Sequence, residues 1–272
     1  GGLWSVNLAF AVPTFSKVAQ MPDGRTAANM NILADGSVVI TGGTDYDQAI
    51  EGQGSYPEDL LNAQYEALRF IPQTKQLLRL EAERVARLYH SAAVQLEDGR
   101  IISGGGGAPG PLQNLNAQFF TPDIFYHSDG KLASSPVITS IDKIISNNDQ
   151  FTIGVENSSK IKGVGAVRSG AVTHSTNSDT RFINLNFSVL DAKTVAVDVP
   201  SANVMIPGHW MLAIVDDAGV PSRYVSIGVG VAPNFFEGYG TLSTAATPLR
   251  KDQPNINGAF KVDALARFDD VD

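Results

Sequence analysis

An internal repeat constrains the fold of this chain more than any other feature of its sequence. Residues 25–43 read RTAANMNILADGSVVITGG, and residues 87–105, which start 62 positions later, read RLYHSAAVQLEDGRIISGG. Each copy contains Asp-Gly, which supplies the positive φ of a tight hairpin turn, then a β-branched run typical of a buried strand, then Gly-Gly. Each copy therefore predicts a hairpin of two inner strands.

A second pair of similar segments follows the two copies and extends the repeating unit. Residues 62–65 read NAQY and residues 116–119 read NAQF, with Pro72 and Pro122 soon after. The unit is thus predicted to have four short strands, and repeats of this length with Gly-Gly after the second strand are typical of β-propeller blades. Residues 58–70 are rich in helix formers, yet the repeat favours a strand over 63–70 with one helical turn before it.

The pattern changes at about Pro136. Alternating apolar runs then recur at intervals typical of a β-sandwich, at residues 151–155, 195–199, 210–214 and 225–229. Asp217-Ala-Gly219 marks a hairpin between the last two runs. We expect an all-β chain with about two propeller blades over residues 1–135, an immunoglobulin-like sandwich over 136–231, and a tail or linker over 232–272.

Composition excludes several functional classes. The formal net charge is −8 and no basic stripe with interleaved aromatic residues is present, which argues against a nucleic-acid partner. No stretch of about 18 apolar residues could span a membrane. The start, Gly1-Gly-Leu-Trp4, has neither a basic region nor a cleavage site of a signal peptide and lacks Met. We therefore expect a processed chain or a piece of a longer protein.

The chain contains no cysteine, so any metal site must use its four histidines with tyrosine or carboxylate help. His90 follows Tyr89 on a predicted strand, and His174 follows Thr173 in the predicted sandwich. Consecutive strand residues point to opposite faces, so Tyr89 and His90 can reach one metal only where the strand bends. We expect His127 to be solvated in a turn and His209 to be structural or on the surface.

The order and spacing of four stretches resemble the copper radical oxidases, the galactose oxidase and glyoxal oxidase group. These stretches lie within roughly residues 20 to 230 and comprise residues 87–91 with 98–100 and 104–107, residues 116–126, residues 173–181, and residues 207–212 with 218–222. The resemblance implies a kelch-type propeller and one Cu(II) held by two imidazoles, a radical-forming tyrosine and an axial tyrosine. Tyr89 matches the axial tyrosine and His90 and His174 match the two histidines, and imidazole and tyrosinate both suit Cu(II).

The resemblance implies an oxidase that converts a small alcohol, aldehyde or carbohydrate with O2 to give hydrogen peroxide. Tyr89 would act catalytically by taking the hydroxyl proton of the substrate. The tyrosine that forms the radical is crosslinked to a cysteine in this family, so the radical cofactor is expected outside this chain, in a missing N-terminal portion of the propeller. The resemblance also implies a secreted or cell-surface location.

A second hypothesis, from a different functional class, stays open. A relative that has lost the chemistry would serve as a kelch and sandwich module that binds a partner or supports structure at the cell surface. The presence of a Tyr-Cys pair in the missing portion would discriminate the two.

Overall fold

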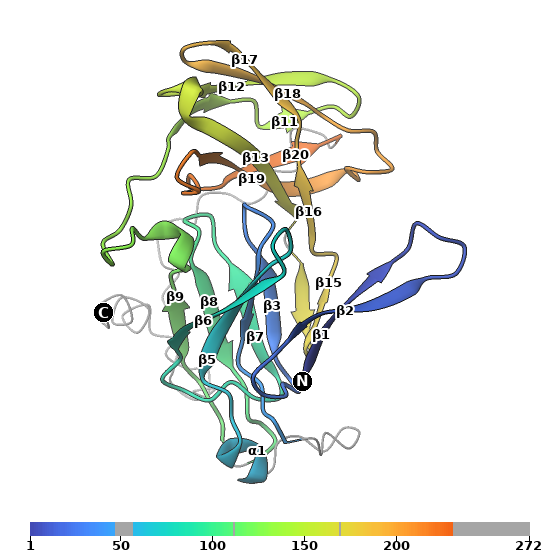
Figure 1. Cartoon of the computed structure of the whole chain (residues 1–272), viewed down its shortest axis with the longest axis vertical. Coiled ribbons are helices and arrows are strands. Elements are labelled where there is room, and N and C mark those ends of the chain that lie inside the picture. Colours follow the sequence, from blue (N-terminus) through green and yellow to red (C-terminus); the bar gives the residue numbers. More distant parts are fainter. Residues whose placement is uncertain (47–56, 111, 169, 231–272) are drawn as a thin grey trace, which may run out of the picture.

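The computed structural model describes residues 1–46, 57–110, 112–168 and 170–230, and these residues form mostly β-strands (Figure 1). The described residues of the first part form three antiparallel sheets. A two-stranded sheet pairs β1 (Gly2–Asn7) with β2 (Thr14–Gln20). A four-stranded sheet follows in the order β3 (Asn29–Ile32), β4 (Val38–Thr41), β5 (Glu66–Ile71) and β6 (Gln76–Ala82). A three-stranded sheet contains β7 (Ser91–Gln95), β8 (Ile101–Gly105) and β9 (Ala117–Phe120).

The two repeat copies form the predicted hairpins, β3–β4 and β7–β8. Gly36 and Gly99 have φ values of 79° and 90°, as the Asp-Gly turns require. The same bond closes both turns, from Leu33 N to Ser37 O and from Leu96 N to Arg100 O, each 2.8 Å long. Local turn chemistry therefore fixes the same register in both copies.

The segment rich in helix formers behaves as the repeat predicted. The helix α1 (Pro57–Leu61) is a single short turn, and β5 then begins at Glu66. The second unit differs from the expected four strands, because the described residues of its sheet provide only β7, β8 and β9. After β9, Pro122 leads into the 3-10 helix η1 (Asp123–Phe125), where Phe125 is buried and backs the turn at Gly99. This turn directs the chain toward the second part of the molecule.

The second part contains two facing sheets, as the alternating runs predicted. One sheet has the order β10 (Ile138–Ile141), β12 (Gln150–Val155), β18 (Thr194–Asp198) and β17 (Phe187–Asp191). The other has the order β11 (Ile144–Ile145), β20 (Val225–Val229), β19 (Gly208–Asp216), β13 (Ile161–Arg168) and β16 (Arg181–Asn184). The 3-10 helix η2 (Ser158–Lys160) precedes β13.

The core of the sandwich comes from the inward-facing residues of these strands. Ile153, Val195, Val197 and Leu212 are fully buried in one cluster with Trp210. The four alternating runs of the sequence correspond to β12, β18, β19 and β20. The expected tail over residues 232–272 lies outside the described residues. None of the helices in the described part of the chain has the length and hydropathy needed to cross a membrane.

The sandwich packs directly on the sheets of the first part. The Gln95 side-chain amide donates to the Tyr224 hydroxyl at 2.8 Å, and Tyr224 N donates to Glu97 O at 2.7 Å. Tyr224 is buried there, which raises the pKa of its hydroxyl. A small hairpin of β14 (Ala171–Thr173) and β15 (Thr176–Ser178) extends from the sandwich and lies against β7 and β3 (Figure 1). This hairpin brings the sandwich to the edge where the second repeat copy begins.

Candidate metal centre

Three aromatic rings from the two parts of the chain meet at this edge. The Tyr89 and His90 rings stack with centroids 3.9 Å apart, and the His174 ring lies 4.7 Å from His90 and 5.6 Å from Tyr89. The Nε2 atoms of His90 and His174 are 3.0 Å apart. The structure thus brings together the three residues that the sequence singled out, although 84 positions separate the two histidines.

Tyr89 and His90 lie in a turn and not on the strand predicted from the sequence. The strand β7 begins only at Ser91, and His90 has a left-handed backbone with φ of 65°. Strand alternation does not apply in such a turn, so consecutive side chains can face the same side. The bend that the sequence required is therefore supplied by one left-handed residue, with Tyr89 half-buried and His90 exposed.

The two repeat copies share the left-handed position but differ by one residue before it. Arg25 and Arg87 make equivalent bonds, to the carbonyls of Gly42 and Gly105. In the first copy, the left-handed residue is Ala27, two positions after its arginine, whereas His90 is three positions after Arg87. The second copy therefore has one residue more between the arginine and the left-handed position. This extra residue is visible in the sequence, because the Asp-Gly turns of the two copies are 63 positions apart whereas the arginines are only 62 positions apart.

His174 occupies a turn of equally uncommon geometry. It joins β14 to β15 with Ser175, and the two residues have φ values of 51° and 63°. Two-residue hairpin turns with positive φ at both central positions favour Asn-Gly, because other side chains are strained there. The hairpin is held in place by Asn177, whose amide donates to Met30 O at 2.9 Å. Strained backbone that the surroundings hold in place is frequent at functional sites.

Hydrogen bonds at the far side of each imidazole orient the two Nε2 atoms. His90 Nδ1 lies 2.9 Å from Ala108 O, and His174 Nδ1 lies 2.5 Å from Thr173 Oγ1. A carbonyl can only accept, so the neutral His90 ring carries its proton on Nδ1 and its lone pair on Nε2. Such partners on the second ring nitrogen are typical of histidines that bind metals. Sequence reasoning missed both partners: Thr173 was visible beside His174, whereas a backbone carbonyl leaves no signal.

The donor set fits a copper ion. Metal–imidazole bonds are about 2.0–2.1 Å long, so two such bonds span up to about 4 Å and nitrogens 3.0 Å apart can share one ion. Imidazole suits Cu(II), and a bound cation favours the phenolate form of a nearby tyrosine. Among the described residues, no cluster of three or more His, Asp or Glu side chains is placed to hold a metal. The family resemblance implies Tyr89 as the third protein ligand from this chain, and its ring stacks on that of His90.

The other two histidines lie elsewhere. His127 is exposed at the start of a turn closed by Gly130 N and His127 O at 2.9 Å, as expected. His209 lies in β19 and is half-buried, and desolvation together with the charge of Arg168 lowers its pKa. Neither imidazole belongs to the ring cluster.

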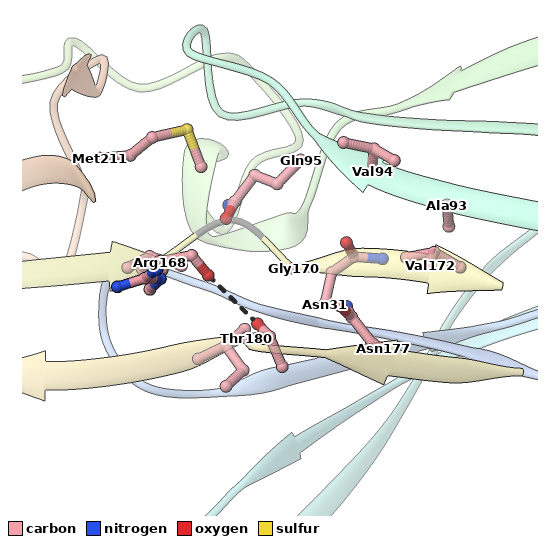
Figure 2. A pocket seen from close by; sticks show the side chains of 12 residues that line it. Asn31, Ala93, Val94, Gln95, Arg168, Gly170, Val172, Asn177, Thr180 and Met211 are labelled. Atoms are coloured by element: carbon pink, nitrogen blue, oxygen red, sulfur yellow. Dashed lines mark hydrogen bonds between the residues drawn. The ribbon is translucent and has the colours of Figure 1, made fainter. Parts of the chain in front are cut away.

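Two cavities of the structure are separate from the ring cluster. Figure 2 shows the smaller one, of about 20 Å³, where Asn31 and Gln95 from the first part face Met211 and Arg168 from the sandwich. A cavity of that size holds a water molecule and no substrate. The other, of about 210 Å³, lies between residues 134–137 and the sandwich strands. Neither is lined by Tyr89, His90 or His174.

Comparison with known proteins gives consistent matches. Residues 135–229 match the family model for a galactose oxidase-like early set domain. A galactose oxidase from Gibberella zeae is 33% identical over 202 residues, which is 73% of this chain and 28% of that protein. The aldehyde oxidase GLOX from Vitis pseudoreticulata is 28% identical over 234 residues, which is 78% of this chain and 43% of that protein.

A solved structure is similar as well. A fungal alcohol oxidase of the AA5 family, in complex with copper, superposes with a TM-score of 0.74 at 27% identity, over 84% of this chain and 47% of that chain. The chain thus spans less than half the length of each of these three relatives.

Proposed function

The chain is homologous to galactose oxidase and glyoxal oxidase, and on that premise we propose that it is the C-terminal part of a copper radical oxidase. The proposed reaction oxidises a primary alcohol or aldehyde with O2. For an alcohol, the substrate loses two electrons and two protons, and O2 gains them to form hydrogen peroxide. The observation that carries the proposal is the convergence of Tyr89, His90 and His174, with the two Nε2 atoms 3.0 Å apart.

Each residue of the cluster has a role in this proposal. His90 and His174 would hold the ion through Nε2, and Tyr89 would complete the protein ligands of this chain. Copper, when bound, would supply one-electron redox chemistry together with a tyrosyl radical from outside this chain. Tyr89 is fixed by stacking on His90, and its phenolate would accept the hydroxyl proton of a small alcohol or carbohydrate.

The domain organisation belongs to the same proposal. Residues 1–135 would be the last blades of a kelch-type propeller, residues 136–231 the immunoglobulin-like domain, and residues 232–272 a tail or linker. A secreted or cell-surface location follows from the family resemblance in the same way.

The N-terminal ribbon, residues 2–20, supports a missing portion of the propeller as a partner. Val6 pairs with Phe15 and Trp4 pairs with Lys17, so the three apolar side chains share one face of the ribbon. Trp4 and Phe15 are 61% and 71% exposed. A two-stranded ribbon is marginally stable alone, and an exposed apolar face of this kind marks a contact surface. We propose that preceding blades cover it.

Copper binding by the purified chain tests the proposed centre. Titration with Cu(II), followed by electron paramagnetic resonance, is expected to show one bound ion with nitrogen ligands. His90→Ala and His174→Ala should each lower the affinity at least about 10-fold, because each removes one imidazole ligand. His127→Ala is the matched control and should bind as the parent does. A parent chain without stoichiometric copper would overturn the proposal.

A second measurement tests where the radical comes from. Without the tyrosine–cysteine pair, the copper-loaded chain is expected to produce no peroxide that depends on added alcohol. Sustained production would show that the radical is formed within these residues. A full-length protein that contains the pair and still forms no radical would favour the inactive binding or structural module.

A further inference from the structure

The two histidines of the cluster differ in what holds their outer nitrogen. The partner of His90 Nδ1 is the Ala108 carbonyl, which can only accept a hydrogen bond. The partner of His174 Nδ1 is the Thr173 hydroxyl, which can donate or accept. His90 therefore has one neutral tautomer in this environment, whereas His174 can use both.

Thr173 is held so that its hydroxyl reaches His174. It is the last residue of β14 and pairs with Thr176 across the turn. The turn residues have positive φ, and the β-branched Thr173 side chain has few rotamers. The contact between Oγ1 and Nδ1 is thus a property of the turn geometry.

The close approach of the two Nε2 atoms requires a different proton position with and without a metal. Two lone pairs 3.0 Å apart repel each other, and His90 Nε2 already presents one. Without a metal, the neutral His174 ring therefore carries its proton on Nε2 and donates to His90, and its Nδ1 accepts from the Thr173 hydroxyl. With an ion on both Nε2 atoms, the His174 proton must be on Nδ1, which then donates to Thr173 Oγ1.

We propose that Thr173 is a positioning residue whose hydroxyl reverses its hydrogen bond when copper binds, so that His174 is oriented in both states. This inference rests on the proposed copper centre. In this proposal, His174 Nδ1 changes from an acceptor to a donor when copper binds. Its partner must therefore be able both to donate and to accept, as the Thr173 hydroxyl can.

Three variants separate this role from a structural one. Thr173→Val keeps the shape and removes the hydroxyl, Thr173→Ser restores a hydroxyl, and Thr176→Val is the matched control on the partner strand of the same turn. Loss of a hydrogen-bond partner next to a ligand typically lowers metal affinity about 10-fold or more, so we expect this loss in Thr173→Val alone. In Thr173→Ser, the affinity should return to within about twofold of the parent.

A spectroscopic signature accompanies the affinity. The electron spin echo modulation from the outer nitrogen of a copper-bound imidazole responds to the hydrogen bond at that nitrogen. It should change in Thr173→Val and match the parent in Thr176→Val. If Thr173→Val binds copper with parental affinity and an unchanged modulation, Thr173 has no positioning role, although the copper centre itself would stand.

A measurement without copper tests the reversal independently. Nitrogen NMR of the metal-free chain, with only four histidines to assign, should show the Nδ1–H tautomer for His90 and the Nε2–H tautomer for His174. An Nδ1–H tautomer for His174 in the metal-free state would overturn the reversal. A parent chain that binds no copper would remove both the centre and the role of Thr173.

Discussion

A group of buried charges lies beneath the segment that carries Tyr89. Arg87 is fully buried, and its Nη1 donates to Gly105 O and Asn116 O at 3.1 and 3.2 Å. Its carbonyl accepts from Gly43 N, two residues after the end of β4, at 2.7 Å. Glu83 is buried beside it, and desolvation raises the pKa of this carboxyl while the charges of Arg87 and Arg25 lower it. The dominance of desolvation means that the charged form of Glu83 weakens the fold.

Glu83→Gln tests this through the pH dependence of stability. The pKa of Glu83 is higher in the folded chain than the ordinary value of 4.5 expected in the unfolded chain. The protonated carboxyl therefore contributes stability that is fully present below pH 4.5 and is lost as the pH rises through the folded pKa. The free energy of unfolding of the parent, relative to Glu83→Gln, should therefore increase as the pH falls toward 4.5. Urea unfolding at a series of pH values measures it, with Glu156→Gln at an exposed position as control. A constant difference would contradict the effect of burial.

At the scale of elements, the β14–β15 hairpin carries strain at its turn. Ser175 has φ of 63°, a region that only glycine enters without steric cost. Yet the hairpin is the element that presents His174 to the second repeat copy, through the bond from Asn177 to Met30. Its stability therefore decides how long the two imidazoles remain together.

Ser175→Gly should relieve this strain. We expect the hairpin to gain up to about 1 kcal/mol, since the left-handed cost is about 1–2 kcal/mol and glycine loses more entropy on folding. Hydrogen exchange of the β14 and β15 amides should slow by up to about fivefold. Gly219→Ala is a control with the opposite expected effect. Gly219 has φ of 83° in another turn, and no atom would clash with an added side chain. Alanine should therefore add backbone strain and speed hydrogen exchange in that turn. Unchanged exchange in Ser175→Gly would show that the turn is unstrained.

At the scale of the whole molecule, the two parts have very different cores. In the described residues, seventeen buried apolar side chains form the main cluster of the sandwich, whereas two clusters of four and three lie in the sheets of the first part. Apolar burial is the main source of folding stability. The sandwich should therefore be the independently stable part, and the first part should depend on partners.

Hydrogen exchange on the isolated chain measures this difference. Amides of Val195–Val199 and Trp210–Val215 should exchange slowly, and those of Val38–Thr41 in β4 should exchange faster, because sheets with small cores open locally. The reference is a longer protein that includes the proposed preceding blades, in which exchange in β4 should slow. Equal protection of both regions in the isolated chain would point to self-association through open strand edges.

The repeat hairpins and the main strands of the sandwich follow from the sequence alone. Asp-Gly turns set both repeat hairpins, and strict alternation set β12, β18, β19 and β20, because turn geometry and side-chain direction depend on near neighbours along the chain. The choice of Tyr89, His90 and His174 came from a resemblance of motifs, since nothing in their spacing brings residues 84 positions apart together.

The geometry of the site, in contrast, depends on contacts between distant residues. The left-handed backbones of His90, His174 and Ser175 have no signal in residue type, because packing of the hairpin on β7 and β3 maintains them against their local preference. The hydrogen bond that His90 Nδ1 donates to Ala108 O, 18 positions away, likewise depends on the fold. Local conformational propensity depends on neighbouring residues in the sequence. The position of a ring nitrogen depends on many long-range contacts, which form only when the chain folds.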